Sequence, residues 1–499
     1  MMKILLSILL IIVSFSFGFS QVGINTTDPD ASAALDIVND ERGVLIPRMT
    51  TAQKNAIVEP AHSLLVYDTD LEGYYFNQGT PTTPNWVLLL TDVKTRDNYV
   101  IVKSVEDFPG GGQGGTITLD ENTLYEVNGT ITLSQSIDVN GAYLIGKDTN
   151  EDVLNYTGNS ALFTGSANAS FRNITFNNSN SGSLFNLTAS STNSLIAQSV
   201  VVNGFSSVGI VGGYGLVFFN VVQYIANSDG ITYTDIGNLL LNNMGWQPSN
   251  GGSYETFTGT FGFIQKVSGF TTVGSGATGL DVSSNPTVSN GTLKSVVFSG
   301  TGDYVDSYTG TGTYTGFNFT NDWAVDCIGI PREDDDNASG NIYITRNSTT
   351  TNPSFSIASA TPINASIDPG QMFRFSNSTS TVTVGNNVLK YEGKETRTFS
   401  ISGNLSYQST NTSNSGVETV HVFFIRRFDS SGTDLGVPLG TEVYSEVGAD
   451  GDELVRAIPL GGKVTLDPGD YVRIYGQFIS ATGTARNNIR VYSVSLTLE

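Results

Sequence analysis

The chain has 499 residues, and its 46 acidic side chains against 24 basic ones give a formal charge of −22. So acidic a protein repels phosphate groups, and no basic patch offsets the repulsion, so we expect no nucleic-acid partner. Only 14% of residues are charged, whereas 39% are hydrophobic and 10% aromatic, which excludes a disordered polypeptide. At roughly 100 to 200 residues per domain, the length allows about two to four domains.

Residues 1–20 predict a cleaved secretory signal. Lys3 precedes an apolar run over residues 4–17, and Gly18 and Ser20 supply small residues before Gln21. The run is too short to span a bilayer and no later stretch reaches about 18 apolar residues, so we expect no membrane insertion. The sole cysteine, Cys327, lies far from the cleavage site and offers neither a lipid anchor nor an internal disulfide. We therefore expect a secreted or extracellular cell-surface protein, with a virion component as the alternative, and a buried, inert thiol at Cys327.

Residues 21–97 form the first predicted module. Thr50 or Thr51 can cap one short helical turn, and residues 64–67 and 74–76 predict strands around a turn at Gly73. The segment closes on Trp86. His62, between these pieces, is interpreted as a surface or packing residue.

Several motifs of this module resemble a known family. They are VGINTTDPDASAALDI at residues 22–37, GVLIPRMT at 43–50, and further matches at 51–57, 64–70, 74–76 and 85–87. Together they resemble the module that opens many secreted proteins of flavobacteria and recurs in bacteriophage tail fibres. The resemblance covers about residues 22–90 and implies an N-terminal attachment module, but it says little about chemistry.

Residues 98–336 change to short β runs separated by Gly, Asn, Ser and Thr. Apolar runs recur at intervals of 26, 21, 22, 24 and 29 residues, marked by Asn173, Ser199, Asn220, Asn242, Lys266 and Ser295. One solenoid turn with three short strands needs about that many residues, so the spacing predicts about eight turns. An irregular β-sandwich is the alternative. Residues 102–109, 116–119 and 125–127 resemble the lead-in to right-handed parallel β-helices of the pectate-lyase type, found in phage tail fibres and tailspikes.

Residues 337–499 alternate apolar and polar positions more cleanly, which predicts an antiparallel β-sandwich. Three strands are marked by faces made of Phe399, Ile401, Leu405 and Tyr407, of Val420, Val422 and Phe424, and of Tyr492, Val494, Leu496 and Leu498. Asp368–Gly370 and Asp467–Gly469 place Pro and then Gly as a type II turn requires. Residues 466–475 and 491–496 resemble jelly rolls of the tumour-necrosis-factor-like type, and this resemblance implies a homotrimer.

A β-helix raises the question of a polysaccharide lyase or glycoside hydrolase. Between Asp148 and Pro331 the only basic residues are Arg172, Lys266 and Lys294, which we interpret as solvent-facing positions, and no histidine lies between His62 and His421. Two acid pairs, Asp303 with Asp306 and Asp322 with Asp326, could approach across a turn as glycoside hydrolysis requires, but turn chemistry accounts for them more simply.

Metal and cofactor signals are weak. Asp148–Asp152 matches the start of a calcium loop, but Val153 and Asn159 stand where Gly and Glu are required. Glu333–Asp336 and Asp450–Glu453 could chelate calcium, but we interpret the first as a solvated acidic linker and the second as a hairpin turn. We therefore assign no catalytic, cofactor-binding or metal-ligating residue and expect no cofactor.

The sequence predicts an all-β protein: a signal at 1–20, the module at 21–97, a right-handed parallel β-helix at 98–336 and a jelly-roll sandwich at 337–499. The function expected is a secreted or cell-surface, fibre-like adhesin, not an enzyme, that binds a glycan or a cell-surface receptor. Five aromatic residues of the β-helix could stack on sugars, but we interpret them as core-packing residues: Tyr214, Trp246, Tyr304, Tyr308 and Tyr314. The alternatives are a phage tail fibre or tailspike, and a β-helix polysaccharide lyase or glycoside hydrolase.

Overall fold

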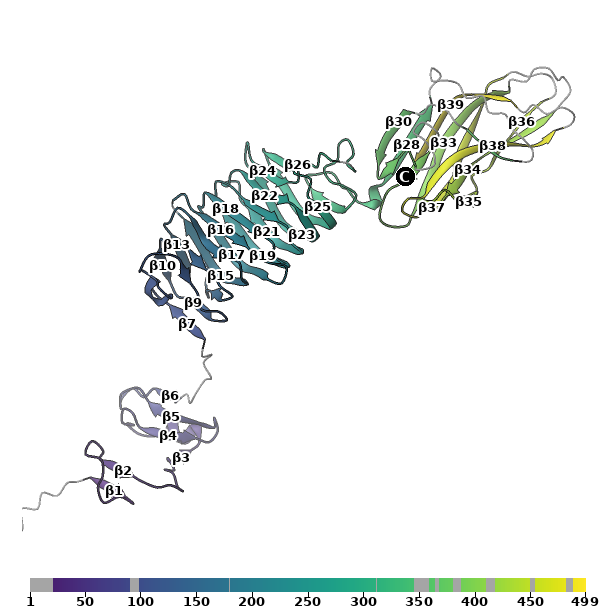
Figure 1. Ribbon diagram of the computed structural model, residues 1–499. Coiled ribbons are helices and arrows are strands. Elements are labelled where there is room, and N and C mark those ends of the chain that lie inside the picture. The colour runs from purple at the N-terminus through teal and green to yellow at the C-terminus, as the bar shows by residue number, and fades with distance from the viewer. Residues whose placement is uncertain are drawn as a thin grey trace, which may run out of the picture. The chain divides into compact units, whose positions relative to one another are not determined.

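The computed structural model describes residues 21–89, 98–178, 180–310, 312–344, 359–363, 368–379, 387–409, 418–448, 454–481 and 488–499. The predicted signal at residues 1–20 lies outside these ranges. The chain divides into two compact units, residues 1–96 and 97–499, and each is described by itself. Figure 1 labels the elements of both.

The first unit is built on a small four-stranded sheet. Its order is β3 (Arg48–Met49), β4 (Leu65–Asp68), β5 (Gly73–Asn77) and β6 (Trp86–Leu88), while β1 (Val22–Ile24) and β2 (Leu35–Ile37) pair separately in parallel. Thr50 is the N-cap of helix α2 (Thr51–Asn55), and its side chain accepts the N–H of Gln53. The predicted cap is therefore confirmed. Lys54 is buried: its ammonium lies 2.7 Å from the Asp68 carboxylate and 3.8 Å from the ring centre of Tyr75.

The second unit starts with a parallel β-solenoid, which confirms the predicted fold (Figure 1). One sheet contains β7 (Tyr99–Val102), β9 (Leu124–Val127), β10 (Thr130–Leu133), β12 (Tyr143–Ile145), β13 (Val153–Tyr156), β15 (Ala169–Asn178), β17 (Ser194–Asn203), β19 (Leu216–Ile225), β21 (Asn238–Trp246), β23 (Thr260–Val273), β25 (Thr287–Gly300) and β27 (Trp323–Ile328). The other contains β8 (Ile117–Thr118), β11 (Ile137–Asp138), β14 (Ala161–Gly165), β16 (Ser183–Thr188), β18 (Ser207–Gly212), β20 (Ile231–Thr234), β22 (Ser253–Thr258), β24 (Thr278–Asp281) and β26 (Asp303–Asp306). A short 3-10 helix, η1 (Val105–Asp107), follows β7.

Within the described residues, the second sheet has nine strands, one for each turn of the solenoid. From β15 onward, each long strand of the first sheet has a non-glycine residue with a positive φ at its corner: Asn173, Ser199, Val221, Asn243, Ser268 (followed in β23 by Gly269, also with a positive φ) and Ser295. The sequence marks at residues 173, 199 and 295 coincide with these bends, whereas the other three marks fall one or two positions before them. A single left-handed residue turns the chain by a corner without interrupting the strand pairing, which explains the regular spacing.

Side chains that point inward fill the solenoid with one continuous apolar core, from Val102 to Val325. Aromatic rings contact one another within a turn and between turns: the ring centre of Phe163 lies 4.5 Å from that of Phe171 in the same turn and 6.1 Å from that of Phe185 in the next. Asparagines link the turns as well: Asn203 donates to Asn177 at 2.6 Å, and Asn177 donates to Asn155 at 3.0 Å. The solenoid is therefore held by contacts between neighbouring turns.

Two antiparallel sheets follow, after the 3-10 helix η2 (Asp335–Asn337). The first has the order β30 (Asp368–Phe373), β28 (Ser339–Ile344), β39 (Ile489–Leu498), β33 (Arg397–Ser409) and β37 (Arg456–Leu466). The second contains β31 (Phe375–Ser376), β32 (Leu389–Tyr391), β38 (Tyr471–Ala481), β34 (Thr419–Phe428) and β35 (Asp434–Gly436), with β29 (Thr361–Pro362) paired to β38 and β36 (Val443–Val447) paired to β34.

The predicted faces of the sandwich strands are confirmed in β33 and, for Val422 and Phe424, in β34, but they differ in β39 at Tyr492. In β34, Phe423 and Ile425 face the main core, while Val422 and Phe424 belong to a second cluster on the opposite face. In β39, Tyr492 is partly exposed, because the pairing shifts by one residue between Ser406 and Tyr407 of β33. Such a bulge turns the residues beyond it to the other face.

One of the two predicted type II turns is confirmed. Gly469 has a φ of +90°, and the N–H of Asp470 donates to the carbonyl of Asp467 at 3.0 Å, as in a type II turn. Asp368–Gly370 instead lies inside β30, where the backbone pairs with β28, so the second turn prediction was wrong.

Candidate functional site

The structure does not assemble the candidate acid pairs into a catalytic site. Asp303 and Asp306 are exposed at the two ends of β26. Asp322, directly before β27, and Asp326, within β27, are exposed too. The carboxylate of Asp322 lies 3.2 Å from the ammonium of Lys394, so a cation already engages it.

The three basic residues between Asp148 and Pro331 divide into two kinds. Arg172 and Lys294 are exposed, as expected. Lys266 was wrongly predicted to face solvent: it is 1% exposed, and its ammonium lies 2.9 Å from Oε1 of Glu255, which is 0% exposed. Burial of both charges in a low-dielectric interior is tolerated because they pair directly.

Aromatic side chains enclose this buried pair. The Lys266 ammonium lies 4.8 Å from the ring centre of Tyr254, which stacks on Trp246 at 4.3 Å. Tyr224 contacts both of these rings, at 5.4 and 5.8 Å between ring centres. Burial raises the pKa of Glu255 despite the neighbouring ammonium, and burial raises the pKa of the Tyr254 hydroxyl well above its usual value. The pair is closed off from solvent, so it serves the fold and not a substrate.

The acidic run Glu333–Asp336 was expected to be a solvated linker, and the structure contradicts this for two of its members. Glu333 is 1% exposed, and its two carboxylate oxygens accept the N–H groups of Asn318 at 2.7 Å and Phe319 at 2.9 Å. Burial raises the pKa of Glu333 to about 7, although these N–H groups and Arg374 oppose the shift. Through these hydrogen bonds, Glu333 connects the segment that follows β27 to the loop that precedes β27.

Asp335 connects the end of the solenoid to the sandwich. Its Oδ1 lies 2.5 Å from Nη1 of Arg374, and its Oδ2 accepts the backbone N–H groups of Lys394 and Glu395, each at 2.8 Å. The Arg374 guanidinium also donates to the carbonyls of Trp323 and, at 3.1 Å, of Glu333. Asp335 and Arg374 are both buried, so every charge at this joint has a polar partner.

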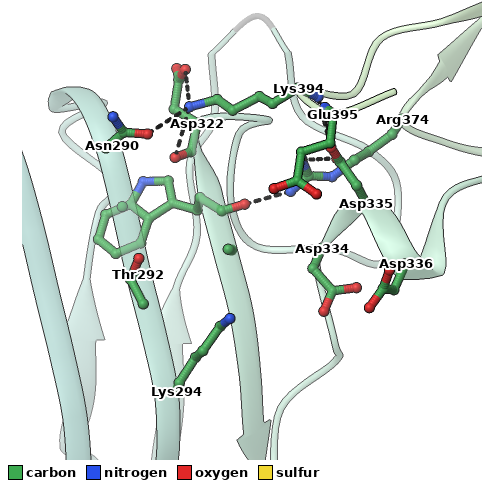
Figure 2. Close-up of a pocket in the computed structure, with 13 residues that line it drawn as sticks. Asn290, Thr292, Lys294, Asp322, Asp334, Asp335, Asp336, Arg374, Lys394 and Glu395 are labelled. Carbon is green, nitrogen blue, oxygen red and sulfur yellow. Dashed lines mark hydrogen bonds and ion pairs between the residues drawn. The ribbon is translucent and has the colours of Figure 1, made fainter. Parts of the chain in front are cut away.

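A charged cleft of about 350 Å³ lies beside this joint. Figure 2 shows acidic and basic side chains on both of its walls, among them Lys294, Asp334, Asp336 and Lys394. Most of these charges are paired: Asp334 and Asp336 with Arg332 at 2.7 and 3.0 Å, and Lys394 with Asp322. The cleft is therefore lined by ion pairs, and it lies between the last solenoid strands and the sandwich.

A second, shallower hollow crosses the sheet of β14, β16 and β18. It measures about 400 Å³, and its lining is neutral, with serines, asparagines and a few apolar residues: Asn159, Ser160, Ala161, Ser181, Ser183, Phe185, Asn186, Ser206, Ser207, Gly209 and Ile210. Some hydroxyls are committed to the scaffold, such as that of Ser206, which donates to the carbonyl of Ser181 at 2.6 Å. The amide and hydroxyl groups suit hydrogen bonds to a polyhydroxylated ligand.

The predicted aromatic candidates are mostly core. Tyr214 and Trp246 are 0% exposed and Tyr308 is 7% exposed, as expected of packing residues. Tyr304 and Tyr314 are half-buried. Tyr314 lines a third pocket, whose opposite wall comes from the sandwich strand β30. Because the two walls are far apart in the sequence, the pocket could not be predicted from the aromatic residues of the solenoid alone.

The remaining candidates take structural positions. The Asp152 carboxylate accepts the N–H groups of Gly129 at 2.9 Å and Lys147 at 2.6 Å, so the candidate calcium loop is a hydrogen-bonded turn. Asp450–Glu453 lies outside the described residues. Cys327 is half-buried, and burial raises the pKa of its thiol. His62 is exposed and hydrogen-bonded to Gly79.

The part of the chain that the structure describes holds no cluster of three or more His, Cys, Asp or Glu side chains arranged to bind a metal ion. Its helices also include none with the length and apolarity that a membrane crossing requires.

The first module is similar to a known protein family. Residues 23–100 match the family described as "Phage tail like trimerisation region". This agrees with the resemblance to phage tail fibres seen in the same residues. No curated protein matches the chain.

Solved structures match the chain at low similarity. The tailspike of Acinetobacter phage vB_ApiP_P1 is 10% identical, with a TM-score of 0.24 and coverage of 92% of this chain and 99% of that one. The bacteriophage CBA120 tailspike protein 4 enzymatically active domain is 11% identical, with a TM-score of 0.19 and coverage of 91% and 78%. Eiger TNF from S. frugiperda is 9% identical, with a TM-score of 0.22 and coverage of 32% and 91%. The fold described above rests on the strand pairing and not on these likenesses.

Proposed function

We propose that the chain is one subunit of a homotrimeric, tail-fibre-like receptor-binding protein that binds glycans on a cell surface. In this proposal the protein is secreted, after cleavage of residues 1–20, or is carried on a cell surface or virion. The domains are residues 21–97, 98–336 and 337–499. The observation that carries the proposal is a phage-tail-like trimerisation region, residues 23–100, directly followed by a β-solenoid.

The surface of the first unit supports association between copies. Val22, Leu45 and Val58 are 54%, 73% and 87% exposed, although each is apolar. Burying such side chains against other copies would remove apolar area from water, at about 25 cal/mol for each Å². The matching family is described as a trimerisation region, which supports three copies in the assembly.

The neutral hollow over β14, β16 and β18 supports a glycan as the ligand. Sugars offer many hydroxyl groups that both donate and accept hydrogen bonds, and the Ser and Asn side chains of this hollow do the same. The net charge of −22 disfavours polyanionic receptors, whose approach it would slow.

Light scattering of the full chain tests the assembly. We expect a mass about three times the 53.1 kDa of one chain, less the signal. A mass close to one chain would overturn the homotrimer.

Glycan arrays and whole-cell binding test the receptor role. We expect binding to at least one neutral glycan and to cells that display it, without new reducing ends or unsaturated uronides in the bound polysaccharide. Failure of both binding assays would overturn the receptor role. Release of products would instead make the protein a polysaccharide lyase or glycoside hydrolase.

A further inference from the structure

A pocket of about 630 Å³ lies between the segment that follows β26 and the sandwich strand β30. Residues 313–317 form one wall, and residues 370–373 of β30 form the other. Strand β30 is at the edge of its sheet, so one side of its backbone is not paired with a strand of that sheet. The volume lies within the range of about 300 to 1,000 Å³ that small-molecule sites occupy.

Three aromatic rings, with Met372, form the apolar part of this pocket. Phe317 stacks on Phe373 with ring centres 4.0 Å apart and planes 19° apart, and Tyr314 meets Phe373 edge-on at 5.4 Å. Phe373 is only 3% exposed, whereas Phe317 and Tyr314 are half-buried, so the latter two present ring surface to the pocket. Asn321 holds the Tyr314 hydroxyl through a 3.2 Å hydrogen bond from Nδ2, which fixes the ring before any ligand arrives.

Apart from these apolar side chains and Gly370, the lining is polar and uncharged. Thr313, Thr315, Ser339 and Gln371 supply hydroxyl and amide groups, and the residues that line the pocket within the described ranges include no acid or base. The charged cleft of Figure 2 differs in this respect, because both of its walls carry ions. In a chain of net charge −22, a pocket free of ionic groups fits a neutral ligand.

We propose that this pocket holds a neutral pyranose of the receptor glycan. One face of a pyranose carries C–H groups and packs on aromatic rings, while its hydroxyls reach polar groups at the rim. Phe317 and Tyr314 supply the platform, and Gln371 and Thr315 supply the rim. A uronic acid is excluded because its carboxylate would be partly desolvated with no cation in the lining to pair with it. This inference rests on the proposed glycan-binding function and assigns it a site.

Saturation-transfer NMR with the full chain tests the site. The probes are the methyl glycosides of glucose, galactose, mannose and N-acetylglucosamine, compared with those of glucuronic and galacturonic acid. We expect transfer to at least one neutral glycoside, strongest at ring C–H protons, and weaker transfer to its acidic counterpart. No transfer to any neutral glycoside, or stronger transfer to the acidic ones, would overturn the proposal.

Variants assign the binding to the pocket. We expect Tyr314→Ala and Phe317→Ala each to weaken the affinity for the neutral glycoside by at least about tenfold, which corresponds to roughly 1.4 kcal/mol of binding free energy. Tyr444→Ala is the matched control, because Tyr444 is 56% exposed on β36 and does not line the pocket. Gln371→Ala, at an exposed rim position, removes a polar contact without disturbing the aromatic packing and should also weaken binding.

The outcomes separate this inference from the function on which it rests. If the wild-type chain binds a glycan and all three pocket variants bind as tightly as Tyr444→Ala, the pocket is wrong and the receptor role stands. If the wild-type chain binds neither glycans nor cells, the receptor role itself fails. Loss of binding in the pocket variants alone, with unchanged circular dichroism, supports the assignment.

Discussion

Replacing Lys266 by Met should destabilise the solenoid strongly, because it removes one partner of a buried ion pair. The ammonium is 2.9 Å from Glu255, and the side chains are 2% and 0% exposed. Loss of one partner from a buried pair costs about 3 to 5 kcal/mol, since the remaining charge stays desolvated. The contact of the ammonium with the Tyr254 ring, at 4.8 Å, is lost too.

The double variant Lys266→Met with Glu255→Leu separates the pair from its packing. It removes both charges and replaces them with apolar groups of similar volume, a change that is often neutral or stabilising in other proteins. We expect the double variant to be more stable than either single variant. Lys294→Met is the matched control, because this exposed lysine should change the free energy of unfolding by no more than about 0.5 kcal/mol.

Hydrogen exchange at β22 and β23, together with thermal unfolding, measures the effect, since a solenoid can open turn by turn. Lys266→Met should lose less stability at pH 5 than at pH 8. Its unpaired Glu255 has a raised pKa, so it is neutral at low pH and becomes a buried charge as the pH rises. A single variant as stable as Lys294→Met, or a double variant less stable than both single ones, would refute the reasoning.

Three further changes test other parts of the second unit. Burial raises the pKa of Glu333 from 4.5 to about 7, so this residue should cost about 3 kcal/mol of stability as the pH rises from about 4.5 to above 7, and Glu333→Gln should flatten that part of the pH profile in unfolding experiments. Val221→Asn should raise stability by about 1 kcal/mol in denaturant titrations, because the β-branched Val221 has a φ of +57° and is 41% exposed. Gly291→Ala should lower the melting temperature and change the near-ultraviolet circular dichroism, because a Cβ at Gly291 would lie 2.2 Å from the Trp323 ring.

The solenoid could be predicted from the sequence because each turn repeats one geometric requirement. Every long strand from β15 onward needs a residue with a positive φ at its corner, and Asn or Ser meets this need at most turns. The exact corner could not be predicted where the residue type is uninformative. At Val221 a β-branched residue takes the left-handed conformation, so the mark fell on the preceding Asn220.

The burial of Lys266 was missed for the same reason. Arg172 and Lys294 directly precede the corner residues Asn173 and Ser295, and both side chains point outward. Lys266 lies two positions before its corner, Ser268, so in an extended strand its side chain points to the opposite face. Lys266 therefore lies one position farther from its corner than Arg172 and Lys294 do from theirs, and in an extended strand this one-residue difference reverses the face.

The acidic run was misread because its partners are distant in the sequence. Arg374 lies 39 residues after Asp335, and the Lys394 backbone N–H that Asp335 accepts lies 59 residues after it. Local composition predicts a solvated linker for four consecutive acids, and only tertiary contacts distinguish the buried Glu333 and Asp335 from the others. The aromatic pocket shares this property, since Tyr314 and Phe373 come from different predicted domains.

The distribution of charge makes one more prediction, about salt. The hollow over β14–β18 and the aromatic pocket have neutral linings, whereas the cleft of Figure 2 is ionic. Raising the salt from about 0.1 M to 1 M shortens the Debye length from about 10 Å to 3 Å, which weakens exposed charge interactions and leaves stacking and neutral hydrogen bonds nearly unchanged. Glycan affinity, measured by titration at both concentrations, should therefore change by less than about threefold, a loss worth roughly 0.7 kcal/mol. A tenfold or larger loss in high salt would locate the ligand among the charges beside Asp335 and Arg374 and contradict both neutral sites.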